Sequence, residues 1–146
     1  MRSNRSIPAA AVIPELAYAD VPAAVTWLCT AFGFVEHLRI GDHRAQLLAG
    51  TGAIVVMDRG REPPGSAAPS GHGVLVRVEG IDAHCARAAA AGAQILAMPT
   101  THPFGERQYS ARDPGGHRWT FSETMSDVDP AAWGGVLVAA RAREPR

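Results

Sequence analysis

GERQYSARDPGGHRWTFSET, residues 105–124, contains two short extended runs separated by a strong turn signal. Residues 109–112 and 118–122 form the runs, and DPGG at 113–116 lies between them. Proline presets a negative φ and glycine permits a positive φ, so the pattern predicts a β-hairpin. In the second run Trp119 and Phe121 alternate with polar residues. One face of this strand can therefore join a core while the other presents polar groups, as in a sheet that forms a cup.

The composition is that of one globular domain without an electrostatic partner. The chain has 146 residues, 47% of them apolar, with 14 basic and 14 acidic residues. This balance favours neither nucleic acid nor a membrane surface as a partner. All the basic residues are arginine, which excludes a Schiff-base or P-loop lysine. No apolar run approaches a membrane span, and Pro8, Pro14 and Glu15 interrupt any signal-peptide core, so we expect a cytoplasmic protein.

Periodicity and turn residues predict the same order of elements twice. The first half reads as strand, helix and three strands, at residues 12–18, 20–32, 34–40, 43–49 and 53–58. The second half reads as a strand, a helix and a strand at 74–78, 82–91 and 93–97, followed by the closing hairpin. Residues 60–71, rich in proline, glycine and serine, read as a linker.

An internal repeat supports this reading. An offset of 59 residues pairs Ala24 with Ala83, Ala31 with Ala90 and Gly33 with Gly92. The same offset aligns the sequence of the first predicted helix with that of the second. Small-residue identities are a weak signal alone, but these coincide with a matching element order.

The string DPGGHRW, preceded by GER, resembles the closing hairpin of the vicinal-oxygen-chelate superfamily of glyoxalases, extradiol dioxygenases and bleomycin-type resistance proteins. The resemblance covers about residues 12–124 and implies an α+β fold, the glyoxalase/bleomycin resistance fold. In that fold two βαβββ modules form a curved, half-open cup of mixed sheet. We therefore expect one domain, 12–124, with modules at 12–59 and 73–124 joined by the linker 60–71. Residues 125–146 form a C-terminal tail, in which PAAW at 130–133 resembles a tail of some relatives.

The resemblance also implies where a divalent metal would be held, and the ligand types are missing. The four implied positions fall on Ile13, on Val56 or Met57, on Gly73 (or His72 if the register shifts by one residue), and on Thr120. Strand alternation would turn His72 away from the cup. A single histidine does not make a metal site, so we expect no metal, no other cofactor and no catalytic residue. No nucleophile elbow, C-x-x-C pair or H-E-x-x-H motif appears either.

Alternation along the predicted strands places a mixed set of side chains inside the cup. The expected ligand-binding residues are Glu15, Ala17, Leu75, Arg77, Arg118, Thr120 and Ser122. Glu15 and Arg77 have an alternative reading as a structural ion pair between strands, because ionisable groups inside a sheet cup need a partner.

The missing ligands favour a homodimeric protein that binds a small organic metabolite or antibiotic without metal, as the bleomycin-resistance branch does. A metal-dependent glyoxalase-type lyase or dioxygenase with unidentified ligands is the alternative. A dimerisation or regulatory module without a small ligand is a third possibility, for which a filled cup would be the evidence.

Overall fold

The computed structural model describes residues 2–60 and 72–137. The predicted linker falls outside the described residues except for Gly60, and so does the end of the predicted tail.

The first half of the chain forms a βαβββ module. Its elements are β1 (Glu15–Tyr18), α1 (Val21–Phe32), β2 (Val35–Ile40), β3 (Arg44–Ala49) and β4 (Gly52–Asp58). The strands make sheet A in the order β1-β4-β3-β2, with β1 parallel to β4 and the other pairs antiparallel.

The second half repeats this arrangement. It contains β5 (Val74–Arg77), α2 (Ile81–Ala90), β6 (Gln94–Thr101), β7 (Glu106–Arg112) and β8 (Arg118–Thr124), followed by the 3₁₀ helix η1 (Pro130–Trp133). Sheet B has the order β5-β8-β7-β6, again with its first strand parallel to its last. The predicted α+β fold of two βαβββ modules is confirmed.

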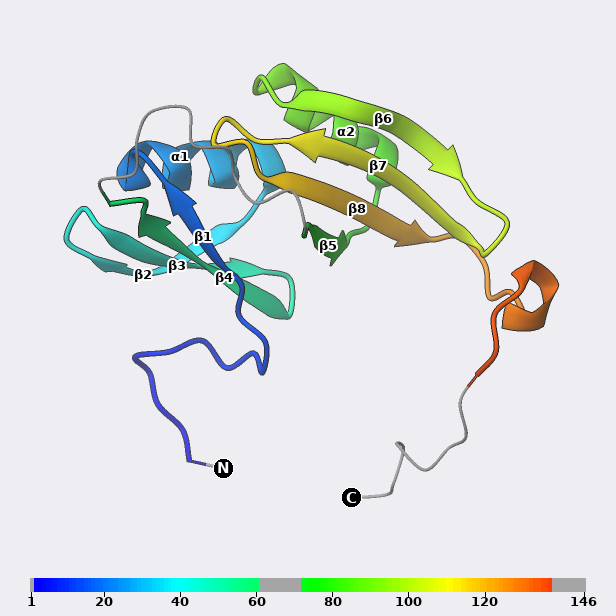
Figure 1. Ribbon diagram of the computed structural model, residues 1–146, viewed down its shortest axis with the longest axis horizontal. Helices are drawn as coiled ribbons and strands as arrows, with labels where there is room; N and C mark the ends of the chain where they lie inside the picture. The colour runs from blue at the N-terminus through cyan, green and yellow to red at the C-terminus, as the bar shows by residue number, and fades with distance from the viewer. Residues whose placement is uncertain (1, 61–71, 138–146) are drawn as a thin grey trace.

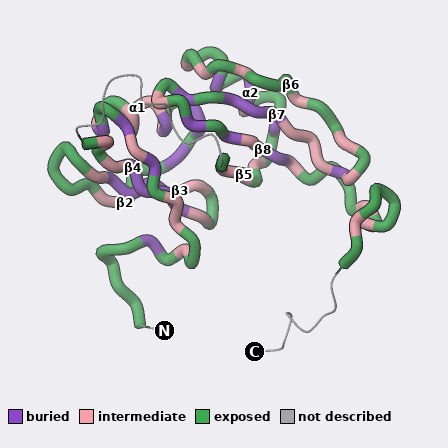
Figure 2. The backbone as a smooth tube through the Cα atoms, in the orientation of Figure 1, coloured by how far each residue is buried: buried purple, intermediate pink, exposed green. Residues whose placement is uncertain are grey.

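The two sheets lie end to end along an arc (Figure 1). One hydrophobic core spans both modules and includes Leu16 and Phe32 from the first and Trp119 and Phe121 from the second. The edge strands β2 and β6 are largely exposed, whereas the central strands carry most of the buried positions (Figure 2). Neither helix of the described ranges is long and apolar enough to cross a membrane.

Three strands differ from the sequence prediction by three or more residues at one end. β1 begins at Glu15 rather than 12, and the preceding Pro14 has no N–H to donate to a ladder. β6 continues to Thr101 rather than 97, because register shifts in its pairing with β7 let it bend and go on past Pro99 at the open edge. β7 accordingly begins at Glu106 rather than 109.

A side chain of each helix donates a hydrogen bond to a carbonyl at the C-terminal end of the other helix. The Nε1–H of Trp27 in α1 donates to the carbonyl of Ala91, 2.7 Å away, just after α2. In return Arg87 of α2 donates through Nε to the carbonyl of Thr30, 2.8 Å away, in the last turn of α1. Terminal carbonyls have no partner within their own helix, so these bonds both satisfy the helix ends and lock the modules together.

A buried carboxylate joins the closing hairpin to the first module. Asp113 is 4% exposed and accepts from the hydroxyl of Tyr18 at 2.6 Å and from Nε1 of Trp119 at 3.0 Å. Its other oxygen accepts from the backbone N–H of His117 at 2.9 Å. Burial, and then the charge of Asp113, raise the pKa of Tyr18, so this hydroxyl stays protonated and donates.

The two glycines of the hairpin turn serve different needs. Gly116 has φ +88°, which a residue with a side chain rarely adopts. Gly115 has an ordinary φ, but a Cβ there would lie 2.6 Å from Cδ2 of Tyr18. The turn therefore needs one glycine for its backbone and the other for contact with β1.

We predict that Tyr18→Phe lowers the free energy of unfolding by about 1.5–3 kcal/mol, because it removes a hydrogen bond to a buried charge. Tyr109→Phe is the matched control, since the Tyr109 hydroxyl bonds Nδ1 of His84 at 2.5 Å. Burial lowers the pKa of His84, so this partner is neutral, and we expect a loss of about 0.5–1.5 kcal/mol. Urea denaturation followed by circular dichroism measures both values. An equal or smaller loss for Tyr18→Phe contradicts the role assigned to Asp113.

Candidate functional site

The face of sheet B that points away from α2 is polar along β7 and β8. Antiparallel pairing sets its side chains opposite one another, as the pairs Arg112 with Arg118, Ser110 with Thr120, Gln108 with Ser122, and Glu106 with Thr124. Alternation sends Tyr109, Trp119 and Phe121 to the opposite face, where they are 0–1% exposed. The same two strands thus complete the core and form the floor of the cup.

Hydrogen bonds hold the middle of this floor in place. Ser122 donates to a carboxylate oxygen of Glu106 at 2.7 Å and accepts from Nε2 of Gln108 at 3.1 Å. The hydroxyls of Ser110 and Thr120 are 3.0 Å apart. Polar groups fixed in this way need little reorganisation to meet a ligand.

Two adjoining hollows of about 470 and 510 Å³ lie over this floor, and both are lined by Leu75 and Gln108. Five of the seven sequence-predicted site residues line one or the other: Leu75, Arg77, Arg118, Thr120 and Ser122. Leu75 is 66% exposed and lines both hollows, so its side chain is accessible to a ligand. Each hollow falls in the size range of small-molecule sites.

Aromatic side chains close one end of the cup. Phe104, before β7, and Trp133, in η1, line the larger hollow, and their rings lie 5.5 Å apart between centroids. The ring of His102 also stacks on Phe104, with 5.0 Å between centroids. Trp133 is 47% exposed, so a large part of its surface remains open to a ligand.

Glu15 and Ala17 are not brought to this site. They lie on β1 in sheet A, and neither lines the two hollows. Glu15 forms an ion pair with Arg44, with Oε2 2.7 Å from Nη2, so the predicted Glu15–Arg77 pair is wrong. The side chains of Glu15 and Arg44 reach each other across β4 within one sheet, whereas Arg77 belongs to the other.

The corresponding face of sheet A is covered by the N-terminal segment. Nε2 of Gln46 donates to the carbonyl of Ser6 at 2.9 Å, and Pro8 is buried. Val55, which pairs with Glu15 on β1, is only 4% exposed. The two modules share a fold, but in the described residues sheet B offers the more open concave face.

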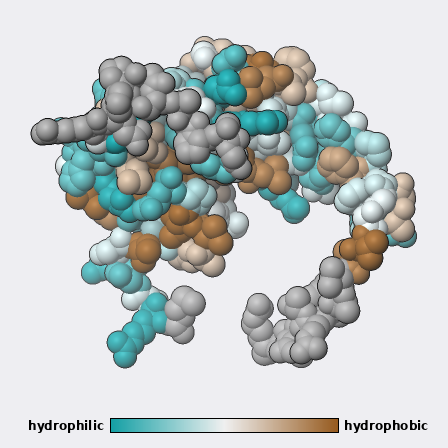
Figure 3. All heavy atoms as spheres, viewed as in Figure 1, coloured by the Kyte–Doolittle hydropathy of each residue, from teal (hydrophilic) through white to brown (hydrophobic). Residues whose placement is uncertain are grey.

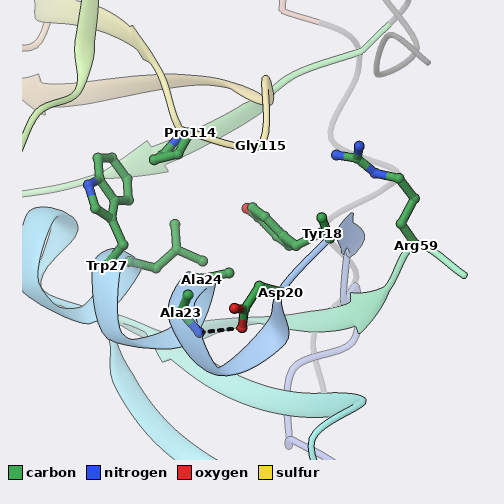
Figure 4. A pocket seen from close by; sticks show the side chains of 10 residues that line it. Tyr18, Asp20, Ala23, Ala24, Trp27, Arg59, Pro114 and Gly115 are labelled. Carbon is green, nitrogen blue, oxygen red and sulfur yellow. Dashed lines mark hydrogen bonds between the residues drawn. The ribbon is translucent and has the colours of Figure 1, made fainter. Parts of the chain in front are cut away.

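Another hollow, of about 420 Å³, lies on the helix side, between α1 and the hairpin turn (Figure 4). Its walls are apolar, but most of its polar groups are already engaged. The Tyr18 hydroxyl bonds Asp113, the Trp27 Nε1–H bonds Ala91, and the Asp20 carboxylate caps the backbone N–H of Ala23. This hollow has few free groups to orient a ligand, so we favour the cup.

The floor of the cup carries charge at both ends. Hydrogen bonds from the hydroxyls of Ser122 and Thr124, with a smaller contribution from the charge of Arg77, lower the pKa of Glu106. Glu106 is therefore a carboxylate at neutral pH. Arg112 and Arg118 place two guanidinium groups at the opposite end of the same two strands.

The residues at the implied metal positions do not fit a divalent cation. Val56 is fully buried in the core and offers only an alkyl group, and Thr120 shares a hydrogen bond with Ser110. Among the described residues no three histidine, cysteine, aspartate or glutamate side chains come together as a metal site would require. His72 lines the smaller of the two cup hollows, and whether its side chain points away from the cup stays a prediction. It precedes β5, where strand alternation does not apply.

Four further residues line the cup and were not among those expected from the sequence: Phe104, Glu106, Gln108 and Trp133. Extending the alternation of β7 backwards from Ser110 would have found Glu106 and Gln108, because they lie on the same face. Phe104 and Trp133 are far apart in the sequence, and no local pattern predicts their contact.

Comparison with protein families matches residues 10–121 to the Glyoxalase/Bleomycin resistance protein/Dioxygenase superfamily. TioX from Micromonospora sp. ML1 is 38% identical, with a TM-score of 0.65 over 81% of this chain and 98% of that chain. A glyoxalase-related enzyme from Fulvimarina pelagi is 19% identical, with a TM-score of 0.63 over 79% of this chain and 88% of that chain. Lactoylglutathione lyase from Agrobacterium tumefaciens is also 19% identical, with a TM-score of 0.59 over 80% and 96%. The comparison with curated proteins gave no match.

We predict that the protein, purified without added metal, carries no stoichiometric zinc, nickel, iron or manganese. The physical reason is that Val56 and Thr120 supply neither imidazole nor carboxylate. Elemental analysis checks this, and EDTA should leave the melting temperature unchanged. About one tightly held ion per chain would contradict the prediction and favour an enzyme.

Proposed function

This chain belongs to the Glyoxalase/Bleomycin resistance protein/Dioxygenase superfamily, and we propose that it binds a small aromatic or polyketide-like metabolite or antibiotic without converting it. The site is the cup of sheet B. The observation that carries the proposal is the fixed polar floor of β7 and β8, bounded by exposed Leu75 and by the Phe104–Trp133 pair.

Apolar walls with a few converging polar groups are the general form of a small-molecule site. Trp133 and Phe104 offer ring faces for an aromatic ligand, and Leu75 offers an aliphatic surface beside them. Arg77 lines the same hollow and can stack on a planar group or bridge a carboxylate. This set of contacts favours a planar ligand with at least one polar or anionic substituent.

A metal-dependent lyase or dioxygenase is less well supported. The superfamily enzymes need a set of imidazole and carboxylate ligands, and in the cup of sheet B the described residues offer one carboxylate, Glu106, and one histidine at the rim, His72. The structural neighbours with enzyme names are below 25% identity and support the fold alone. A purely structural module is also less well supported, because its cup would be filled by side chains.

We further propose a homodimer, as expected from the sequence, and infer that the second copy covers the cup. Both sheets have open edge strands, and Leu75, Met98 and Val35 are each more than 60% exposed. Figure 3 shows apolar patches on the inner side of the arch, where a partner would lie. Cys29 and Cys85 are free thiols, which suits the reducing cytoplasm that we propose as its location.

We predict that Arg77→Ala weakens ligand binding by about 1.5–3 kcal/mol, the range for hydrogen bonds to charged groups. A panel of planar aromatic compounds is first screened by quenching of tryptophan fluorescence, and calorimetry then measures the affinity of a hit. Trp133→Phe should remove most of the quenching, because Trp27 and Trp119 lie outside the cup. The matched control is Arg44→Ala, which breaks the Glu15 ion pair on sheet A and should leave affinity unchanged. Equal effects of the two arginine variants would contradict the assigned site.

We predict that light scattering at micromolar concentration gives twice the mass of one 15.4 kDa chain. The physical reason is the open strand edges and the exposed apolar residues of the inner face. Leu75→Glu should favour the monomer by placing a charge on that face. A mass of one chain for the wild-type protein rules out the dimer, though not the ligand site.

A further inference from the structure

Two arginines face each other at the turn end of the cup. Arg112 of β7 and Arg118 of β8 are direct cross-strand partners, and alternation sends both side chains to the concave face. Like charges directly opposite each other destabilise a strand pair. Both residues are exposed, so water screens part of this repulsion, and a bound anion would remove more of it.

These arginines line a small polar hollow of their own, about 110 Å³ in volume. His72 and His117 line it too, and none of the described residues that line it is acidic. The Nε2–H of His117 donates to the carbonyl of Ala17 at 2.8 Å, which fixes the ring against β1, and Nδ1 of the neutral ring is then an acceptor. The backbone of Gly73 lies close to that of Arg118, since a Cβ at this position would be only 3.3 Å from the Arg118 carbonyl.

The acidic residues nearby do not neutralise this cluster. The described ion pairs engage Arg39, Arg44 and Arg107, and within the described ranges neither Arg112 nor Arg118 has a carboxylate or side-chain hydrogen-bond partner. Asp113 is adjacent in sequence, but both its oxygens accept bonds on the core side of the hairpin. The hollow thus combines unneutralised positive charge with several free N–H donors.

We propose that this hollow is an oxyanion site, in which Arg112 and Arg118 together hold a carboxylate or phosphate group. Arginine forks match both groups geometrically, and the volume suits a small anion rather than a whole ligand. His72, Gly73, Val74 and Arg118 also line the adjoining cup hollow. This inference also extends the proposed function and rests on it: the ligand in the cup is then an aromatic acid, and its anionic group binds between Arg112 and Arg118.

The test uses the full chain and two probes, inorganic phosphate and benzoate, each compared with chloride at equal ionic strength. We expect phosphate and benzoate each to raise the melting temperature more than chloride does, and we expect the increase to saturate as the probe concentration rises. Arg118→Gln and Arg112→Gln should each weaken phosphate binding by about tenfold or more. In chloride alone each variant should be at least as stable as the wild type, because the opposing charges are relieved. The control is Arg107→Gln, on the other face of β7 beside Asp82, which should keep the response to phosphate.

The two probes also identify the source of the anion. Tighter binding of benzoate indicates the carboxylate of an aromatic ligand, whereas tighter binding of phosphate indicates a free or esterified phosphate. The oxyanion site is wrong if neither probe exceeds chloride, or if Arg107→Gln loses binding as much as Arg118→Gln. If the fluorescence screen still finds a cup ligand, only this inference fails. If phosphate binds at Arg112 and Arg118 but the screen finds nothing, only the proposed function fails.

Discussion

The buried carboxylate of Asp113 is the interaction on which the relation between the two modules depends. It accepts three hydrogen bonds, one of them from Tyr18 at the end of β1. A buried charge with fewer donors is strongly unfavourable, so the hairpin and β1 must meet in this arrangement. The reciprocal bonds of Trp27 and Arg87 to carbonyls at the C-terminal ends of α2 and α1 then join the two helices. Together they hold sheet B at a set position relative to sheet A.

The cup can be polar while the core stays apolar, because side chains of β7 and β8 alternate between the two faces of sheet B. Trp119, Phe121 and Tyr109 fill the core, and the residues between them form hydrogen-bonded pairs on the other face. Alternation makes these roles independent, so the polar floor can suit a ligand while the core stays apolar. Arg112 and Arg118 are the exception, since they place two like charges directly opposite each other.

Repetition of the module has not produced two equal sites. In sheet A the N-terminal segment lies over Gln46, and Arg44 engages Glu15. In sheet B the corresponding face stays open and is extended by η1, which adds Trp133. The difference arises from the segments outside the repeats, one before β1 and one after β8.

The sequence by itself determined the fold, because turn residues, periodicity and a resemblance in one hairpin all act locally. Local patterns of this kind predicted the Asp20 cap, the two glycines of the hairpin turn at 115 and 116, and the alternation of β8. The same alternation placed Leu75, Arg77, Arg118, Thr120 and Ser122 on one face. Only the tertiary structure decided that Glu15 belongs with Arg44, that Trp133 reaches Phe104, and that His72 lines a hollow with Arg118. These contacts join segments far apart in the chain, and strand alternation states which face a side chain takes but not which distant residue lies beside it.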